Sequence, residues 1–130
     1  MFDFLRNRAY KRAILLRLSG NDPQAEVPPG GKTQLLFNMT MFALMGRVSK
    51  LDGVVTQEEI DFATSIMQQL RFDVSQCQQA AQYFDQGKQL NTDVMQCVRN
   101  LARTIGPKSE LADLFLKIQC RLAYSKGEMR

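Results

Sequence analysis

The chain has 130 residues, 45% hydrophobic and 23% charged, which is typical of one globular domain and excludes disordered and low-complexity classes. It contains no histidine, which excludes imidazole-dependent triads and zinc sites, and its three cysteines form no C-x-x-C pair. The net charge of +4 lies in residues 1–18, and the neutral remainder predicts no nucleic-acid partner, because such binders carry a basic face on the domain itself.

Residues 1–18 are predicted to form a basic amphipathic helix. Apolar residues recur every three or four positions and would line one stripe: Phe2, Leu5, Ala9, Ala13 and Leu16. Five basic residues flank or oppose this stripe: Arg6, Arg8, Lys11, Arg12 and Arg17. Such a helix could lie on an anionic membrane surface, or it could dock on the rest of the protein. A third alternative is that it follows a membrane anchor outside this chain.

Residues 19–31 are predicted to be a linker, because three of the four prolines and three of the eight glycines fall there. Residues 32–130 then follow a helical pattern throughout. A long helix is expected over 32–50, with Gly46 as a close-packing position against another helix. No stretch of the chain approaches the ~18 consecutive apolar residues of a membrane-spanning helix.

The later helices are predicted from their start and stop signals. Thr56 and Glu59 have the spacing of a capping box that begins a helix. Asp73 or Ser75 can cap the next helix, and two more are expected over 92–104 and 109–122, separated by a break at Gly106. The predicted fold is therefore all-α, a single bundle of about five to six helices.

An internal pseudo-repeat links two of these helices. Residues 42–53 align with residues 116–127 at a constant offset of 74, which pairs Arg47 with Arg121 and Gly53 with Gly127. In the first copy a capped helix follows the glycine turn. In the second copy the chain ends where that helix would begin, which predicts a domain truncated at its C-terminal end.

Several segments carry a resemblance to a known family. Residues 45–59 resemble the TerB-like signature, a helix followed by A/S-K-x-D-G-x-V-T-x-x-E. Residues 84–88 and 114–127 resemble the F-x-x-G-K and M-F-L-x-I-Q elements of the N-terminal domain of DjlA-type membrane co-chaperones. The resemblance covers residues 35–127. It implies an all-helical TerB-like bundle from a bacterial, membrane-anchored protein whose cytosolic J domain stimulates a DnaK-type chaperone.

Two departures limit what this resemblance carries over. A J domain works through a His-Pro-Asp triplet, and this chain has no histidine. The membrane-spanning segment of DjlA also has no counterpart here. The resemblance therefore implies an accessory domain or a shorter relative in the cytoplasm, at the cytoplasmic face of the inner membrane, with its DnaK-type partner reached through a J domain outside this chain.

The resemblance also raises a divalent cation site, since TerB-like domains hold metal ions through acids at their turns. The matching residues are Asp52 and Glu59, and oxygen ligands of this kind suit Ca²⁺. The alternative is that Asp52 is a turn residue and Glu59 the capping-box partner. Lys126 stands in the second turn where the first has Asp52, and would repel a cation. No other cofactor is predicted.

The sequence predicts no enzyme, because it has no glycine-rich phosphate loop and no nucleophile with a base. The first functional hypothesis is a non-catalytic protein-interaction or regulatory domain. The second is a peripheral membrane adaptor that uses the basic helix, with a metal-binding TerB-type stress (tellurite) protein as a further alternative. If the domain is truncated, apolar surface left on its last helix could also support a homodimer.

Overall fold

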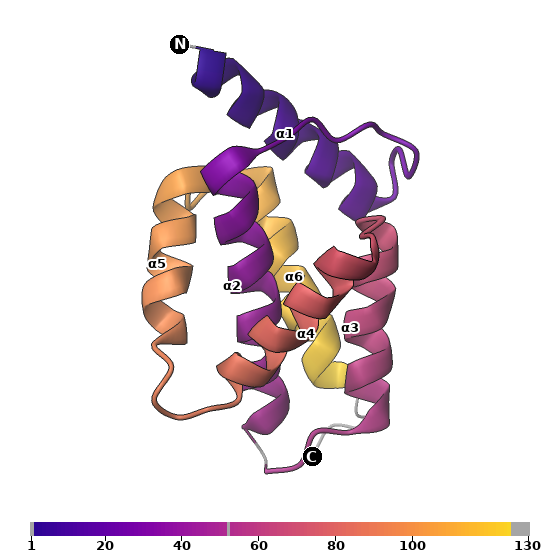
Figure 1. Ribbon diagram of the computed structural model, residues 1–130, viewed down its shortest axis with the longest axis vertical. Helices are drawn as coiled ribbons and strands as arrows, with labels where there is room; N and C mark the ends of the chain where they lie inside the picture. Colours follow the sequence, from indigo (N-terminus) through magenta and orange to yellow (C-terminus); the bar gives the residue numbers. More distant parts are fainter. Residues whose placement is uncertain (1, 52, 126–130) are drawn as a thin grey trace.

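The computed structural model describes residues 2–51 and 53–125, and this part of the chain contains six helices and no strand (Figure 1). The prediction of an all-α bundle of about five to six helices is confirmed. The helices are α1 (Phe2–Ser19), α2 (Gly31–Lys50), α3 (Gln57–Gln69), α4 (Val74–Gly87), α5 (Val94–Ile105) and α6 (Glu110–Tyr124).

The bundle is organised around α2, which contacts each of the other five helices. Its fully buried side chains include Phe37, Met41, Phe42 and Met45. Figure 1 shows α5 on one side of α2, α3 and α6 on the other, α4 crossing obliquely, and α1 lying across one end. Burial of these large apolar side chains supplies most of the stability of such a bundle.

Short side-chain motifs determine where the helices begin. The predicted capping box is confirmed: the Glu59 amide donates to Thr56 Oγ1 at 3.3 Å, and the Thr56 amide donates to Glu59 Oε1 at 2.9 Å. Asp73, and not Ser75, caps α4 through a second capping box with Gln76. Each box supplies side-chain acceptors for two backbone N–H groups that the helix itself leaves without partners.

The apolar stripe predicted for α1 is wrong at Leu5 and Ala9, and its Leu16 is half-buried. Leu5 is 56% exposed and Ala9 is exposed, whereas only Ala13 of that set is buried among the described side chains. The buried stripe is Tyr10, Ala13, Ile14 and Leu18, and it packs into the same core as the other helices. The helix carries two neighbouring apolar arcs, and the surface offered by α2, α3 and α6 selects the second.

The two helices that carry the pseudo-repeat, α2 and α6, pack against each other in the core. Phe37 and Phe115 meet edge-to-face with ring centroids 5.9 Å apart. Gln119 Nε2 donates a hydrogen bond of 3.1 Å to the carbonyl oxygen of Met41. Lys126 and Gly127 of the second turn lie outside the described residues, so the predicted truncation stays a prediction.

Candidate functional site

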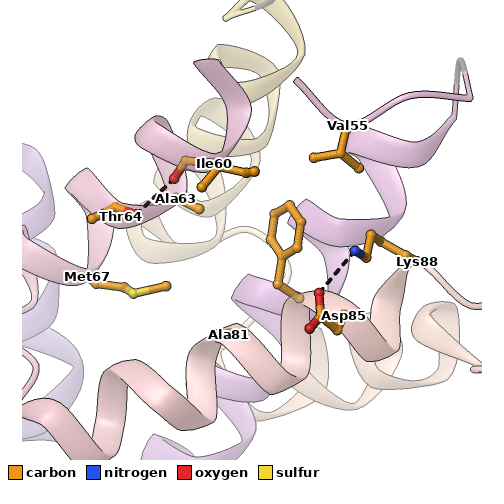
Figure 2. A pocket seen from close by; sticks show the side chains of 9 residues that line it. Val55, Ile60, Ala63, Thr64, Met67, Ala81, Asp85 and Lys88 are labelled. Atoms are coloured by element: carbon orange, nitrogen blue, oxygen red, sulfur yellow. Dashed lines mark hydrogen bonds and ion pairs between the residues drawn. The ribbon is translucent and has the colours of Figure 1, made fainter. Parts of the chain in front are cut away.

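An open apolar groove of about 260 Å³ lies between α3 and α4 (Figure 2). Side chains from both helices and from the preceding loop point into it. Its apolar lining consists of Val55, Ile60, Ala63, Met67, Ala81 and Phe84. Ile60 is 44% exposed, and its side chain lines the open groove. Sequence patterning alone did not identify this groove.

The groove has one polar end. Lys88 Nζ lies 3.0 Å from Asp85 Oδ1, and the same ammonium lies 5.9 Å from the centroid of the Phe84 ring. Thr64 also lines the groove, but its hydroxyl donates to the carbonyl oxygen of Ile60 at 2.9 Å. The site therefore combines exposed apolar surface with a charged edge, which suits binding of an apolar side chain more than bond-making chemistry.

The predicted basic surface on α1 is divided by the structure. Arg8 and Arg12 are exposed and lie one turn apart, away from the buried stripe, whereas Lys11 is half-buried and lies between them and that stripe. The side chain of Arg6 lies outside the described residues. Arg17 is turned inward: its Nε donates to the carbonyl of Ala25 at 2.6 Å.

A second contact of Arg17 crosses the bundle. Its Nη1 donates to the carbonyl oxygen of Leu70, at the end of α3, at 2.9 Å. Burial lowers the pKa of the Arg17 guanidinium, the charge of Arg71 lowers it further, and Asp22 opposes this shift. Arg17 thus uses two donors to hold α1 in place, which the sequence pattern did not indicate.

Of the two residues predicted to form the cation site, the structure describes only Glu59. Asp52 lies outside the described residues. Glu59 is fully buried, and its Oε1 accepts from both the amide and the hydroxyl of Thr56, at 2.9 and 3.1 Å. No group of three potential metal-ligating side chains occurs within residues 2–51 and 53–125. The capping role of Glu59 is confirmed, and metal binding by Asp52 and Glu59 stays a prediction.

Arg47 emerges as an architectural residue. Its guanidinium donates to the carbonyl oxygens of Gly87, Gln89 and Thr92, each at 2.8 Å. These bonds tie α2 to the loop between α4 and α5. The repeat alignment singled out Arg47 and Arg121 as a pair, but Arg121 is exposed, so the two arginines have different roles. The internal repeat therefore identified a matching pair of arginines but did not predict what either one does.

No helix in the described part of the chain is both long and apolar enough to cross a membrane. Cys77 and Cys97 are half-buried and Cys120 is exposed, and all three are free thiols.

Comparison with known proteins places these features in a family. The family model described as "Tellurite resistance protein TerB" matches residues 38–130. Co-chaperone protein DjlA of Mannheimia succiniciproducens is 34% identical over 96 residues, which cover 74% of this chain and 33% of the relative. The DjlA proteins of Coxiella burnetii and Shewanella oneidensis are 35% and 34% identical, over 75% and 74% of this chain and 36% and 37% of their own lengths.

The chain thus spans about a third of the length of these curated relatives. No solved structure matches it. The six-helix bundle, the capped turn before α3 and the match over residues 38–130 agree with one another, and the chain belongs to the TerB family.

Proposed function

We propose that this chain is a non-catalytic protein-interaction domain of a DjlA-like co-chaperone, acting at the cytoplasmic face of the inner membrane. Its similarity to co-chaperones supports this assignment. The chain contains no histidine, so the His-Pro-Asp triplet of a J domain has to lie elsewhere. The partner is a component of a DnaK-type chaperone system, and the J domain outside this chain completes the function.

The groove between α3 and α4 carries the proposal. It leaves Ile60 and Ala81 open to solvent beside Met67 and Phe84, an arrangement that costs free energy unless a partner covers it. About 260 Å³ accommodates one or two apolar side chains of an amphipathic helix. The Asp85–Lys88 pair at the edge supplies polar contacts that orient such a helix.

The test is a binding titration with a matched pair of variants. The purified chain is titrated with a DnaK-type chaperone and, separately, with the J domain of a DjlA co-chaperone. Ala81→Glu places a charge in the groove, and Gln82→Glu places the same charge one residue away on the exposed side of α4. Because both positions are exposed, both variants are expected to fold, as circular dichroism would verify.

We expect one of the two proteins to bind, and Ala81→Glu to weaken that binding at least tenfold while Gln82→Glu leaves it unchanged. A tenfold loss corresponds to about 1.4 kcal/mol, the scale of a central interface residue. Absence of binding to both proteins, or equal affinities of the two variants, would overturn the proposal.

A second candidate function rests on the basic side of α1. Arg8, Lys11 and Arg12 lie together, whereas Tyr10, Ile14 and the rest of the apolar stripe are buried in the bundle. A membrane contact would therefore be electrostatic and peripheral, without insertion of that apolar face. Each basic residue near an anionic surface contributes roughly 1 kcal/mol.

Vesicle sedimentation tests this candidate. Wild-type chain is expected to bind vesicles that contain anionic lipid, to lose binding at high salt, and to ignore neutral vesicles. Arg8→Glu with Arg12→Glu would abolish binding, whereas charge reversal at the exposed Arg99 and Arg103 of α5 would preserve most of it. Equal binding to neutral and anionic vesicles would exclude the role.

A further inference from the structure

A second cavity, of about 180 Å³, lies where the end of α1, the first half of α2 and the turn between α3 and α4 meet. In Figure 1 this is the region where α1 approaches the junction of α3 and α4. The cavity differs in character from the apolar groove, since polar side chains form most of its surface. These side chains are Tyr10, Arg17, Gln34, Asn38, Arg71 and Gln76.

The cavity is cationic. Arg17 and Arg71 both line it, and its lining, all of which lies within the described residues, contains no aspartate or glutamate. Burial and the charge of Arg71 both lower the pKa of Arg17, which means that the exposed Arg71 guanidinium repels the half-buried guanidinium of Arg17. Asp22 offsets this repulsion only in part. An anion inside the cavity would relieve it.

Two amide side chains that line the cavity, those of Gln34 and Gln76, keep their NH₂ groups available as donors. Gln34 Oε1 accepts from the amide of Gly30 at 2.9 Å, and Gln76 Oε1 accepts from the amide of Asp73 at 3.0 Å. A backbone N–H can only donate, so these bonds assign the oxygen of each side chain and leave its NH₂ group for another acceptor. The side chain of Asn38 makes no hydrogen bond within the described part of the chain.

Tyr10, which also lines the cavity, adds an independent observation. The residue is 1% exposed, and its hydroxyl is buried with no hydrogen-bond partner among the described residues. A buried hydroxyl without a partner is unfavourable, and native proteins satisfy nearly all such groups. An acceptor atom that entered the cavity beside Tyr10 would provide the bond that the protein itself does not.

Arg71 occupies a position that favours glycine. Its φ is +58°, and the amide of Phe72 donates to the carbonyl oxygen of Met67 at 3.0 Å, as in the Schellman motif that ends many helices. A left-handed residue there is usually glycine because any Cβ is strained. An arginine at this position brings an exposed cationic side chain to the edge of the cavity at a cost in backbone conformation, and its Nη1 donates to Gln24 Oε1 at 3.4 Å.

We propose that this cavity binds a phosphate group, either as free phosphate or as the phosphomonoester end of a larger molecule. Arg17 and Arg71 supply charge, the NH₂ groups of Gln34 and Gln76 supply directed donors, and the Tyr10 hydroxyl supplies a further one. These donors exceed what the two oxygens of a carboxylate use well, whereas a phosphate presents three or four oxygens.

The site is distinct from the groove of the proposed protein interaction. It joins three elements that are far apart in the sequence: α1 through Arg17, α2 through Gln34, and the α3–α4 turn through Arg71. Binding would therefore strengthen the attachment of α1 to the bundle, which at present depends on the two hydrogen bonds of Arg17 and on the buried stripe.

Calorimetric titration of the full chain with inorganic phosphate tests the proposal, with sodium chloride of equal ionic strength and acetate as reference anions. Phosphate is expected to bind at least tenfold more tightly than acetate, and to raise the thermal unfolding midpoint where chloride does not. Arg71→Gly is the main variant, because glycine suits the left-handed position and the fold is expected to be retained.

Arg71→Gly and Tyr10→Phe are each expected to weaken phosphate binding at least tenfold, and Arg121→Ala, which removes an exposed charge from α6, to leave it unchanged. Tyr10→Phe removes the buried hydroxyl, so the apo protein should be no less stable than wild type. Absence of phosphate binding, or equal binding in wild type and both cavity variants, would overturn the proposal.

The source of the phosphate is separated by two further arms. Glycerol 3-phosphate presents a soluble phosphomonoester, and vesicles with phosphatidic acid present the same group on a surface, with phosphatidylglycerol vesicles as the phosphodiester control. Sensitivity to Arg71→Gly is expected in whichever arm contains the true ligand. Vesicle binding that depends on Arg8 and Arg12 but not on Arg71 would show that the membrane contact is made by α1 and not by this cavity.

Discussion

Gly46 of α2 and Gly87 of α4 lie at the crossing of these helices, and each glycine receives the backbone of the opposite helix. A Cβ built on Gly46 would overlap the carbonyl of Phe84, and one built on Gly87 would overlap the carbonyl of Ala43. The two helices approach so closely because neither glycine has a side chain. Phe84, at this crossing, also lines the apolar groove.

Substitution at this crossing is expected to destabilise the whole bundle. Gly46→Ala and Gly87→Ala each force backbone against backbone, which cannot be relieved by a change of rotamer, and each should cost about 2–3 kcal/mol of unfolding free energy. Gln82→Ala, at an exposed position of α4, should change it by less than about 0.5 kcal/mol. Urea unfolding measures all three, and glycine variants as stable as wild type would contradict this packing.

Loss of the Arg47 guanidinium is expected to release the loop between α4 and α5. Arg47→Ala removes three hydrogen bonds to backbone carbonyls and should cost about 2 kcal/mol. Arg47→Lys retains the charge but not the fork of donors, so it should rescue only part of that loss. In Arg47→Ala, backbone amides of residues 88–93 should also exchange faster with solvent. The control Arg121→Ala should leave both the unfolding free energy and this exchange unchanged.

The stability of the protein is expected to fall at alkaline pH through Tyr10. Burial raises the pKa of its hydroxyl well above the ordinary value. Above about pH 10 the unfolded chain loses this proton while the folded protein keeps it, so stability falls as pH rises, by up to about 1.4 kcal/mol per pH unit. Tyr10→Phe should reduce this slope in urea-unfolding measurements, and Tyr124→Phe, at a 59% exposed residue, should not.

The substitution Glu59→Gln distinguishes the capping role of this residue from the predicted cation site. Gln Oε1 can accept the same bonds from Thr56, so Glu59→Gln should keep most of the cap, which is worth about 1 kcal/mol in total. From the cap geometry we expect millimolar Ca²⁺ to leave the thermal midpoints of both proteins unchanged. A rise in the wild-type midpoint that disappears in Glu59→Gln would instead establish the cation site at Asp52 and Glu59.

Short-range patterns predicted much of the fold. The Thr56–Glu59 capping box depends on residues three positions apart, so the sequence contains all the information needed to identify it. Gly46 was predicted as a close contact because a glycine inside a continuous apolar pattern has few other uses, and the structure places it against α4. The residue on the other side of that contact, Gly87, lies 41 positions away along the chain, and no local pattern links the two glycines.

Long-range relationships could not be predicted from such short-range patterns. The apolar pattern of α1 is compatible with two faces, and only contact with α2, α3 and α6 buries Tyr10 and Ile14 in place of Leu5 and Ala9. Arg17 was grouped with the basic surface residues, but it donates to the carbonyl of Leu70, 53 positions away along the chain. Neither outcome has a local signal.

The amino-acid sequence by itself determined the all-α class, the positions where its capped helices begin, the concentration of positive charge in residues 1–18 and the family signature, because each depends on composition or on residues within a few turns of one another. The tertiary structure alone decided which face of α1 is buried, how Ile60 remains open beside α4, and why Arg17, Gln34 and Arg71 line one cavity. Those arrangements depend on how six amphipathic surfaces share one core, and that competition is resolved only when all of them pack together.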